Sequence, residues 1–234
     1  MKISSVILSC LIIAVLAISA SAQWVPLTGA PVPISSLPDR TLIFGDKKFS
    51  EIDVFGIGVG GAIAPTADSL LVQGGQNDGN YGLWFLLSWN AASGQSINAD
   101  LNFKVSVLPG SDEYIKDVEL VITGSSATGT GVVNVGETVW DAPFPDGDVI
   151  ASLSASKQAG DDGAYLVAHK EFVPRKEIWI FSKDISITGG TNGSAHLSGL
   201  FQFYSQTQVP EPATVCLLSI GGLILLRRRR KKHL

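Results

Sequence analysis

Apolar and polar residues alternate along much of this 234-residue chain. From Leu101 to Val107 the alternation is strict, which places one set of side chains on a buried face of a strand and the other on a solvent face. Four later segments repeat the pattern and predict strands whose apolar residues face a core. Their apolar positions are Val118, Leu120 and Ile122; Trp179 and Phe181; Ile185 and Ile187; and Leu197, Phe201 and Phe203 around Gly199.

Turn-forming residues separate these segments at short intervals. Glycine, proline, asparagine and aspartate gather there because they adopt turn conformations or hydrogen-bond their own backbone. Strands of this length and spacing indicate an all-β fold, a single antiparallel β-sandwich or jelly roll over residues 41–206. The turn clusters lie at Gly74-Gly75, Asn77 to Asn80, Ser93-Gly94, Pro109-Gly110, Ser125 to Gly131, Pro145 to Asp148, Asp161 to Gly163 and Gly189-Gly190.

The first 22 residues have the pattern of a secretory signal peptide, expected as an apolar helix. Lys2 precedes the apolar stretch, and Ala20 and Ala22 are the small residues that signal peptidase requires, so cleavage is expected before Gln23. Residues 23–40 contain four prolines and are expected to form an extended lead-in to the β body.

Residues 207–234 form a tail with three features in order. A Pro210-Glu211-Pro212 motif, here the PEP motif, precedes an uncharged run over 213–226. As a helix this run would measure about 21 Å, against roughly 30 Å for a bilayer core, so it is a marginal transmembrane helix. Basic residues mark the cytoplasmic end of a span, so the body is expected outside the inner membrane. The basic cluster that follows the run is Arg227, Arg228, Arg229, Arg230, Lys231 and Lys232.

Val209, the PEP motif and Ala213, together with the apolar run and the arginines, resemble the PEP-CTERM sorting signal of bacterial envelope proteins. The resemblance covers the tail alone. It implies that exosortase, a membrane-embedded cysteine transpeptidase of bacteria that make extracellular polysaccharide, recognises the tail, cuts it and replaces it.

The PEP motif also has a physical basis for recognition. Two prolines hold the backbone near the polyproline region and remove two N–H donors, so the segment stays extended. We expect Glu211 and the prolines to be recognised by the partner enzyme, which supplies the nucleophile. The alternative is an ordinary stop-transfer anchor, in which these residues are only a linker.

Charge is distributed unevenly between tail and body. The tail holds six of the 17 Lys and Arg and the signal peptide one, whereas 20 of the 21 Asp and Glu lie in residues 23–208. The body is therefore acidic by about ten charges, and nucleic acid is not expected as a partner because phosphates would repel it. Cys10 and Cys216 both lie outside the body, so it has no disulfide and no thiol nucleophile.

Three glycines have the spacing of a dinucleotide-binding loop. Gly56, Gly58 and Gly61 follow an apolar strand, but that loop needs a helix behind it to hold a pyrophosphate. Pro65 stands where the helix would form, so a flexible strand or bulge is the favoured interpretation.

His169 and Glu171 are two residues apart and share one face of a strand with Tyr165. Such a pair can bind a metal or transfer protons. No second histidine is spaced to complete a site, so a solvated strand face is favoured. The other histidine of the body, His196, is expected to be exposed opposite Leu197, and no catalytic residue is assigned.

Two aspartate-rich turns are the candidates for calcium, since hard cations take carboxylate oxygens from loops. They are Asp146-Gly147-Asp148 and Asp161-Asp162-Gly163, and neither has the spacing of an EF-hand loop. Aspartate also favours turns for its own hydrogen bonds, so no cofactor is expected and calcium is the one alternative.

Aromatic residues provide the remaining lead. Trp84, Trp89, Trp140 and Trp179 with Tyr81 include the residues that could stack on sugar rings, and core packing is favoured for all except Trp140. We therefore expect a non-enzymatic envelope or matrix protein with a structural or adhesive body. A carbohydrate-binding module with Trp140 as the ligand contact is the alternative, and an extracellular hydrolase the third.

Overall fold

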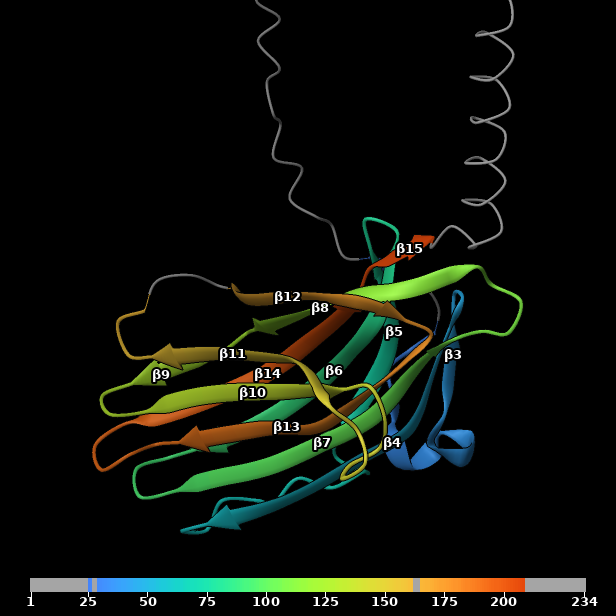
Figure 1. Cartoon of the computed structure of the whole chain (residues 1–234). Helices are drawn as coiled ribbons and strands as arrows, with labels where there is room; N and C mark the ends of the chain where they lie inside the picture. The colour runs from blue at the N-terminus through green and yellow to red at the C-terminus, as the bar shows by residue number, and fades with distance from the viewer. Residues whose placement is uncertain (1–24, 27–28, 162–164, 209–234) are drawn as a thin grey trace, which may run out of the picture.

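The computed structural model describes residues 25–26, 29–161 and 165–208, which form two antiparallel β-sheets (Figure 1). The predicted signal peptide with Ala20, Ala22 and Gln23 lies outside the described residues. So does the sorting tail from Val209 onward, including the apolar run and the basic cluster. Within the described part, the two regular helical segments are the short 3₁₀ turns η1 (Ile34–Ser36) and η2 (Pro38–Arg40).

The first sheet, sheet A, has the strand order β1-β5-β6-β14-β8-β12. Three short strands pair beside this path: β2 with β5, β9 with β14, and β15 with β8. The strands are β1 (Val25–Pro26), β2 (Val32–Pro33), β5 (Leu71–Asn77), β6 (Asn80–Ala91), β8 (Glu113–Thr123), β9 (Ser126–Thr128), β12 (Tyr165–Arg175), β14 (Ser194–Tyr204) and β15 (Gln206–Gln208).

The second sheet, sheet B, has the order β11-β10-β13-β7-β4-β3 and lies across from sheet A (Figure 1). All of its pairings are antiparallel. The strands are β3 (Leu42–Phe44), β4 (Lys47–Val59), β7 (Ser96–Val107), β10 (Val132–Trp140), β11 (Val149–Gln158) and β13 (Glu177–Thr188).

The inner faces of the two sheets share one apolar core, the arrangement of a β-sandwich. Phe85 of β6 and Phe103 of β7 meet across it, with ring centroids 5.6 Å apart. The predicted alternation in β7 is confirmed, because Leu101, Phe103 and Val105 are buried while the residues between them are partly exposed. Burial of such alternating faces is the main source of stability for a fold of this kind.

A charged network is also enclosed by this core. Lys183 of β13 donates hydrogen bonds to Glu137 of β10 and to Gln202 of β14, and the amide of Gln202 donates to the other Glu137 oxygen at 3.0 Å. All three side chains are buried, so polar contacts join the sheets as well as apolar ones. Burial lowers the pKa of Lys183, and the carboxylate of Glu137 opposes that shift.

Backbone irregularities correct two predictions about which residues face the core. The register of β14 shifts between Leu197 and Gly199, so Leu197 faces inward while Phe201 and Phe203 face outward. In the first half of β13 the core residues are Ile178 and Ile180, whereas Trp179 and Phe181 lie on the outer face; the predicted inward orientation of Ile185 and Ile187 is confirmed. The alternation predicts that every second side chain of these strands faces the core. It does not predict which set faces inward, because an inserted residue reverses the two faces.

Most predicted turns lie between strands, although the predicted turn from Ser125 to Gly131 contains the short strand β9. Asp78 and Gly79 have φ angles of 48° and 82° and connect β5 to β6, as expected for a tight hairpin. Gly74 and Gly75, in contrast, lie inside β5. A Cβ atom on Gly74 would lie 2.6 Å from the Phe44 ring, so glycine is needed there for close packing and not for a turn.

The proline-rich segment before residue 41 contacts the sandwich. Its strand β2 pairs with β5, and Ile34, the residue that follows, is fully buried in the core. A hydrogen bond from Ile34 N to Leu70 O, 3.0 Å long, fixes the segment to the body. Part of the segment therefore contributes to the folded core.

Candidate functional site

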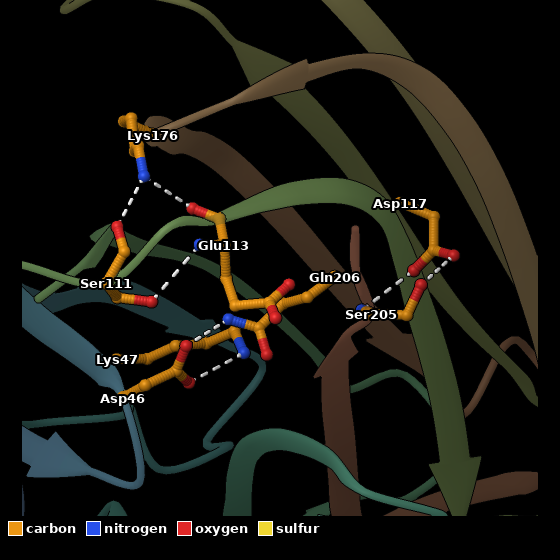
Figure 2. A network of polar contacts seen from close by, with 8 residues as sticks. All are labelled: Asp46, Lys47, Ser111, Glu113, Asp117, Lys176, Ser205 and Gln206. Atoms are coloured by element: carbon orange, nitrogen blue, oxygen red, sulfur yellow. Dashed lines mark hydrogen bonds and ion pairs between the residues drawn. The ribbon is translucent and has the colours of Figure 1, made fainter. Parts of the chain in front are cut away.

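The last described strand, β15, lies immediately before the PEP motif and is held by polar contacts (Figure 2). Ser205, which precedes β15, donates its backbone N–H to Asp117 Oδ1 at 2.9 Å and its hydroxyl to Asp117 Oδ2. In β15, Gln206 pairs with Ile115 and Gln208 with Glu113 of β8. We call residues 205–208 and these contacts the tail base.

Side chains from the turn between β3 and β4 and from β8 also bind the tail base; Figure 2 shows the first of these. The amide of Gln206 donates to Asp46 Oδ2, and Asp46 Oδ1 lies 3.3 Å from the Lys47 ammonium group. The amide of Gln208 donates to Glu113 Oε1 at 3.2 Å. Lys47 is buried, and this desolvation lowers its pKa although Asp46 raises it.

A neighbouring ammonium group fixes the loop beside the tail base. Lys176 Nζ donates to the carbonyl oxygens of Ser111 and Glu113 at 2.6 and 2.8 Å, and it lies 4.0 Å from the centroid of the Tyr114 ring. This contact holds the start of β8, with which β15 pairs. The tail base is therefore part of the folded body.

Asp117 also faces the histidine that the sequence singled out. His169 Nε2 lies 3.3 Å from Asp117 Oδ2, and one ligand atom each from Asp117, His169 and Glu171 lie within 4.8 Å of one another. The register of β12 against β8 explains this, because Glu171 pairs with Asp117 and His169 with Glu119. Burial is the largest cause that raises the pKa of Glu119, while His169 lowers it and Asp117 raises it further.

The interpretation of His169 and Glu171 as members of one strand face is confirmed, but the sequence did not indicate Asp117. A third residue of the group comes from the neighbouring strand, and strand register cannot be read from the spacing within one strand. The side chain of Tyr165 lies outside the described part of the structure.

Four aromatic residues gather on the outer face of sheet B, and we call them the aromatic cluster. Trp140 and Trp179 are cross-strand partners, and the Phe144 ring stacks on Phe181 with centroids 5.1 Å apart and planes inclined by 13°. Trp140 meets Phe144 edge to face at 5.5 Å. Phe144 is 53% exposed and Phe181 37% exposed, whereas both tryptophans are partly buried.

Charged groups border the aromatic cluster. Lys104 Nζ lies 4.8 Å from the Trp179 ring centroid and 2.8 Å from Glu177 Oε2. Arg175 Nη2 lies 3.7 Å from the carboxylate of Asp141, the residue after Trp140. The cluster thus combines exposed ring surface with hydrogen-bonding groups.

The expectation of core packing is wrong for Trp179 and holds for Trp89, which is 5% exposed. Trp84 is also an exception, because it lies on the outer face of sheet A and stacks on Phe201 at 5.2 Å. Phe203 continues this row but is only 5% exposed, so the row offers less ring surface than the aromatic cluster. Sequence reasoning missed Phe144, which a loop brings back over sheet B.

The remaining candidates have structural explanations. Gly56 and Gly58 belong to β4, where a Cβ atom on Gly58 would lie 2.7 Å from the carbonyl carbon of Ala62, so the strand interpretation is confirmed. His196 Nδ1 lies 2.8 Å from Asn90 Oδ1. Across the described residues, no helix is both long and apolar enough to cross a membrane.

The aspartate turns show ordinary turn contacts. Asp141 Oδ1 accepts the backbone N–H of Asp148 at 2.9 Å, and Asp161 Oδ2 accepts that of Gln158 at 2.6 Å. The described residues of these two turns do not form a group of three metal-ligand side chains. Gly163 and Asp162 lie outside the described ranges.

Comparison with known proteins assigns the segment that follows the tail base. Residues 208–231 match the family model described as the PEP-CTERM protein-sorting motif. The chain therefore carries a PEP-CTERM sorting motif. The match begins at Gln208, the last residue of β15, so the PEP-CTERM motif follows the folded body directly. It implies an exported protein that exosortase sorts. A search of curated proteins finds no match to the chain.

Proposed function

We propose that the PEP-CTERM tail holds this protein in the inner membrane by a single span, with the β body outside, until exosortase cuts the tail. The family match at residues 208–231 carries this proposal. The six basic residues after the apolar run support the orientation, because such residues stay on the cytoplasmic side. The membrane contact is then transient, and the processed body belongs to the cell surface or the extracellular matrix.

The tail proposal gives Glu211 and the two prolines the role of recognition elements. We expect the surface form, released from cells and measured as an intact protein, to have lost the Arg227 to Leu234 segment. Replacing Pro210 and Pro212 by alanine should leave the uncut form in the membrane fraction. A matched control is Lys231→Ala, which leaves the PEP motif intact. Recovery of the complete tail on the surface form would instead identify an ordinary stop-transfer anchor.

For the body we propose a non-enzymatic, adhesive role in which the aromatic cluster binds extracellular polysaccharide. The observation that supports it is the exposed Phe144 ring stacked on Phe181, beside Trp140. The apolar C–H face of a pyranose ring stacks on such rings, and charged groups at the edge can hydrogen-bond its hydroxyls. The ion pairs of Lys104 with Glu177 and of Arg175 with Asp141 supply those groups.

The polysaccharide proposal is tested with residues 23–208, which contain both sheets of the sandwich. We expect this fragment to bind the cell's own polysaccharide in a pull-down, and Phe144→Ala and Trp140→Ala each to weaken binding about tenfold, the effect of roughly 1.4 kcal/mol of lost stacking. Phe55→Ala is the matched control, since Phe55 is 70% exposed on β4 of the same sheet and lies outside the aromatic cluster. Equal binding by all three variants would contradict the proposal and leave a purely structural role.

A further inference from the structure

One side-chain group on the outer face of sheet A has the composition of a metal site. Asp117 of β8 and His169 and Glu171 of β12 each offer one ligand atom, and these atoms lie within 4.8 Å of one another. His169 Nε2 and Asp117 Oδ2 are 3.3 Å apart. Ligands that share one Zn²⁺ ion at about 2.0–2.2 Å are separated by roughly 3.3–3.6 Å, so small side-chain movements complete the geometry.

The three ligands differ in their freedom to move. Asp117 is 6% exposed and is fixed in place by the N–H and hydroxyl of Ser205. A metal ligand held by such outer contacts is already oriented for binding. His169 and Glu171 are exposed on the edge strand β12. Their side chains can close on an ion that arrives from solvent, with one coordination position left for water.

The ligand types select the class of cation. Zinc and related transition-metal ions accept imidazole nitrogen together with carboxylate oxygen as ligands. Calcium takes six to eight oxygen ligands, which three side chains including an imidazole do not provide. Glu119, the cross-strand partner of His169, adds a further negative charge beside the group.

We propose that Asp117, His169 and Glu171 bind one zinc-class divalent cation that links β12 to β8 next to the tail base. The site goes beyond the sorting and adhesive roles and does not depend on either. β12 is an edge strand of sheet A, and a bound ion connects it to β8. Because the three ligands come together only in the folded protein, the ion stabilises the native state by mass action.

The test uses the exported protein, freed of metal with a chelator and titrated with Zn²⁺ by calorimetry. We expect one ion per chain, a higher melting temperature with Zn²⁺, and the visible absorption of low-symmetry Co²⁺ when cobalt replaces zinc. His169→Ala and Glu171→Gln should each weaken Zn²⁺ binding at least about 100-fold, the upper range for losing even an outer-shell contact. Both residues are exposed, so the variants should fold.

The matched control is His196→Ala, which removes the other histidine in the described part of the body and should leave Zn²⁺ binding unchanged. Calcium should bind far more weakly than zinc. Failure of the native protein to bind Zn²⁺, or equal affinity in the native protein and His169→Ala, would overturn the proposal. Neither result would affect tail processing or polysaccharide binding, which are measured separately.

Discussion

Lys183 is a charged residue enclosed by an apolar core. Removing an ammonium group from water costs several kcal/mol, and only its contacts with Glu137 and Gln202 offset that cost. Such a network makes a modest net contribution when complete and becomes strongly unfavourable when one member is lost. Its specific effect is to fix which residues of β10, β13 and β14 lie opposite one another across the core.

We predict that Lys183→Met lowers the free energy of unfolding by about 3–5 kcal/mol, because it leaves the Glu137 carboxylate buried without its cation. The triple change Lys183→Met, Glu137→Leu and Gln202→Leu removes every polar member. It should bring the stability back to the native value or above it by about 1–4 kcal/mol. Chemical denaturation monitored by tryptophan fluorescence measures both. A triple variant no more stable than Lys183→Met would contradict this account of the network.

At the scale of elements, the hydrophobic pattern predicts the buried face of some strands but not of others. β7 could be predicted because its alternation runs unbroken from Leu101 to Val107. The outward orientation of Phe201 could not, since the register shift after Leu197 leaves no mark in the hydrophobic pattern. The contact between Asp117 and His169 could not be predicted either, because it depends on the register of β12 against β8.

The carboxylate of Asp117 holds Ser205, the residue that precedes the short strand β15. We predict that Asp117→Ala raises the amide exchange rate of residues 206–208 at least about tenfold, because two hydrogen bonds to a charged group, each worth roughly 1.5–3 kcal/mol, are lost. Hydrogen exchange followed by mass spectrometry measures it. Ser205→Ala keeps the backbone hydrogen bond and should have a smaller effect. Unchanged protection in Asp117→Ala would show that pairing with β8 alone holds the strand.

At the scale of the whole molecule, features formed by consecutive residues could be predicted from the sequence, whereas contacts between distant segments could not. The sorting tail could be recognised because its three features lie in order along the chain, from Val209 to Lys232. The aromatic cluster could be predicted only in part. The sequence indicates Trp140, but Phe144 contacts it from a loop and Trp179 from another strand, and these contacts depend on the complete fold.

The attachment of β15 also limits how far the body can stand from the membrane. Gln208 belongs to a strand, and Ala213, where the apolar run begins, is five positions further along the chain. A fully extended chain covers about 3.3–3.6 Å per residue, so the linker from Gln208 to Ala213 spans at most roughly 18 Å. Whatever finally holds the protein at Ala213 therefore holds the sandwich close by. In the proposed membrane-anchored form the sandwich thus stays near the bilayer surface and cannot act as a long arm.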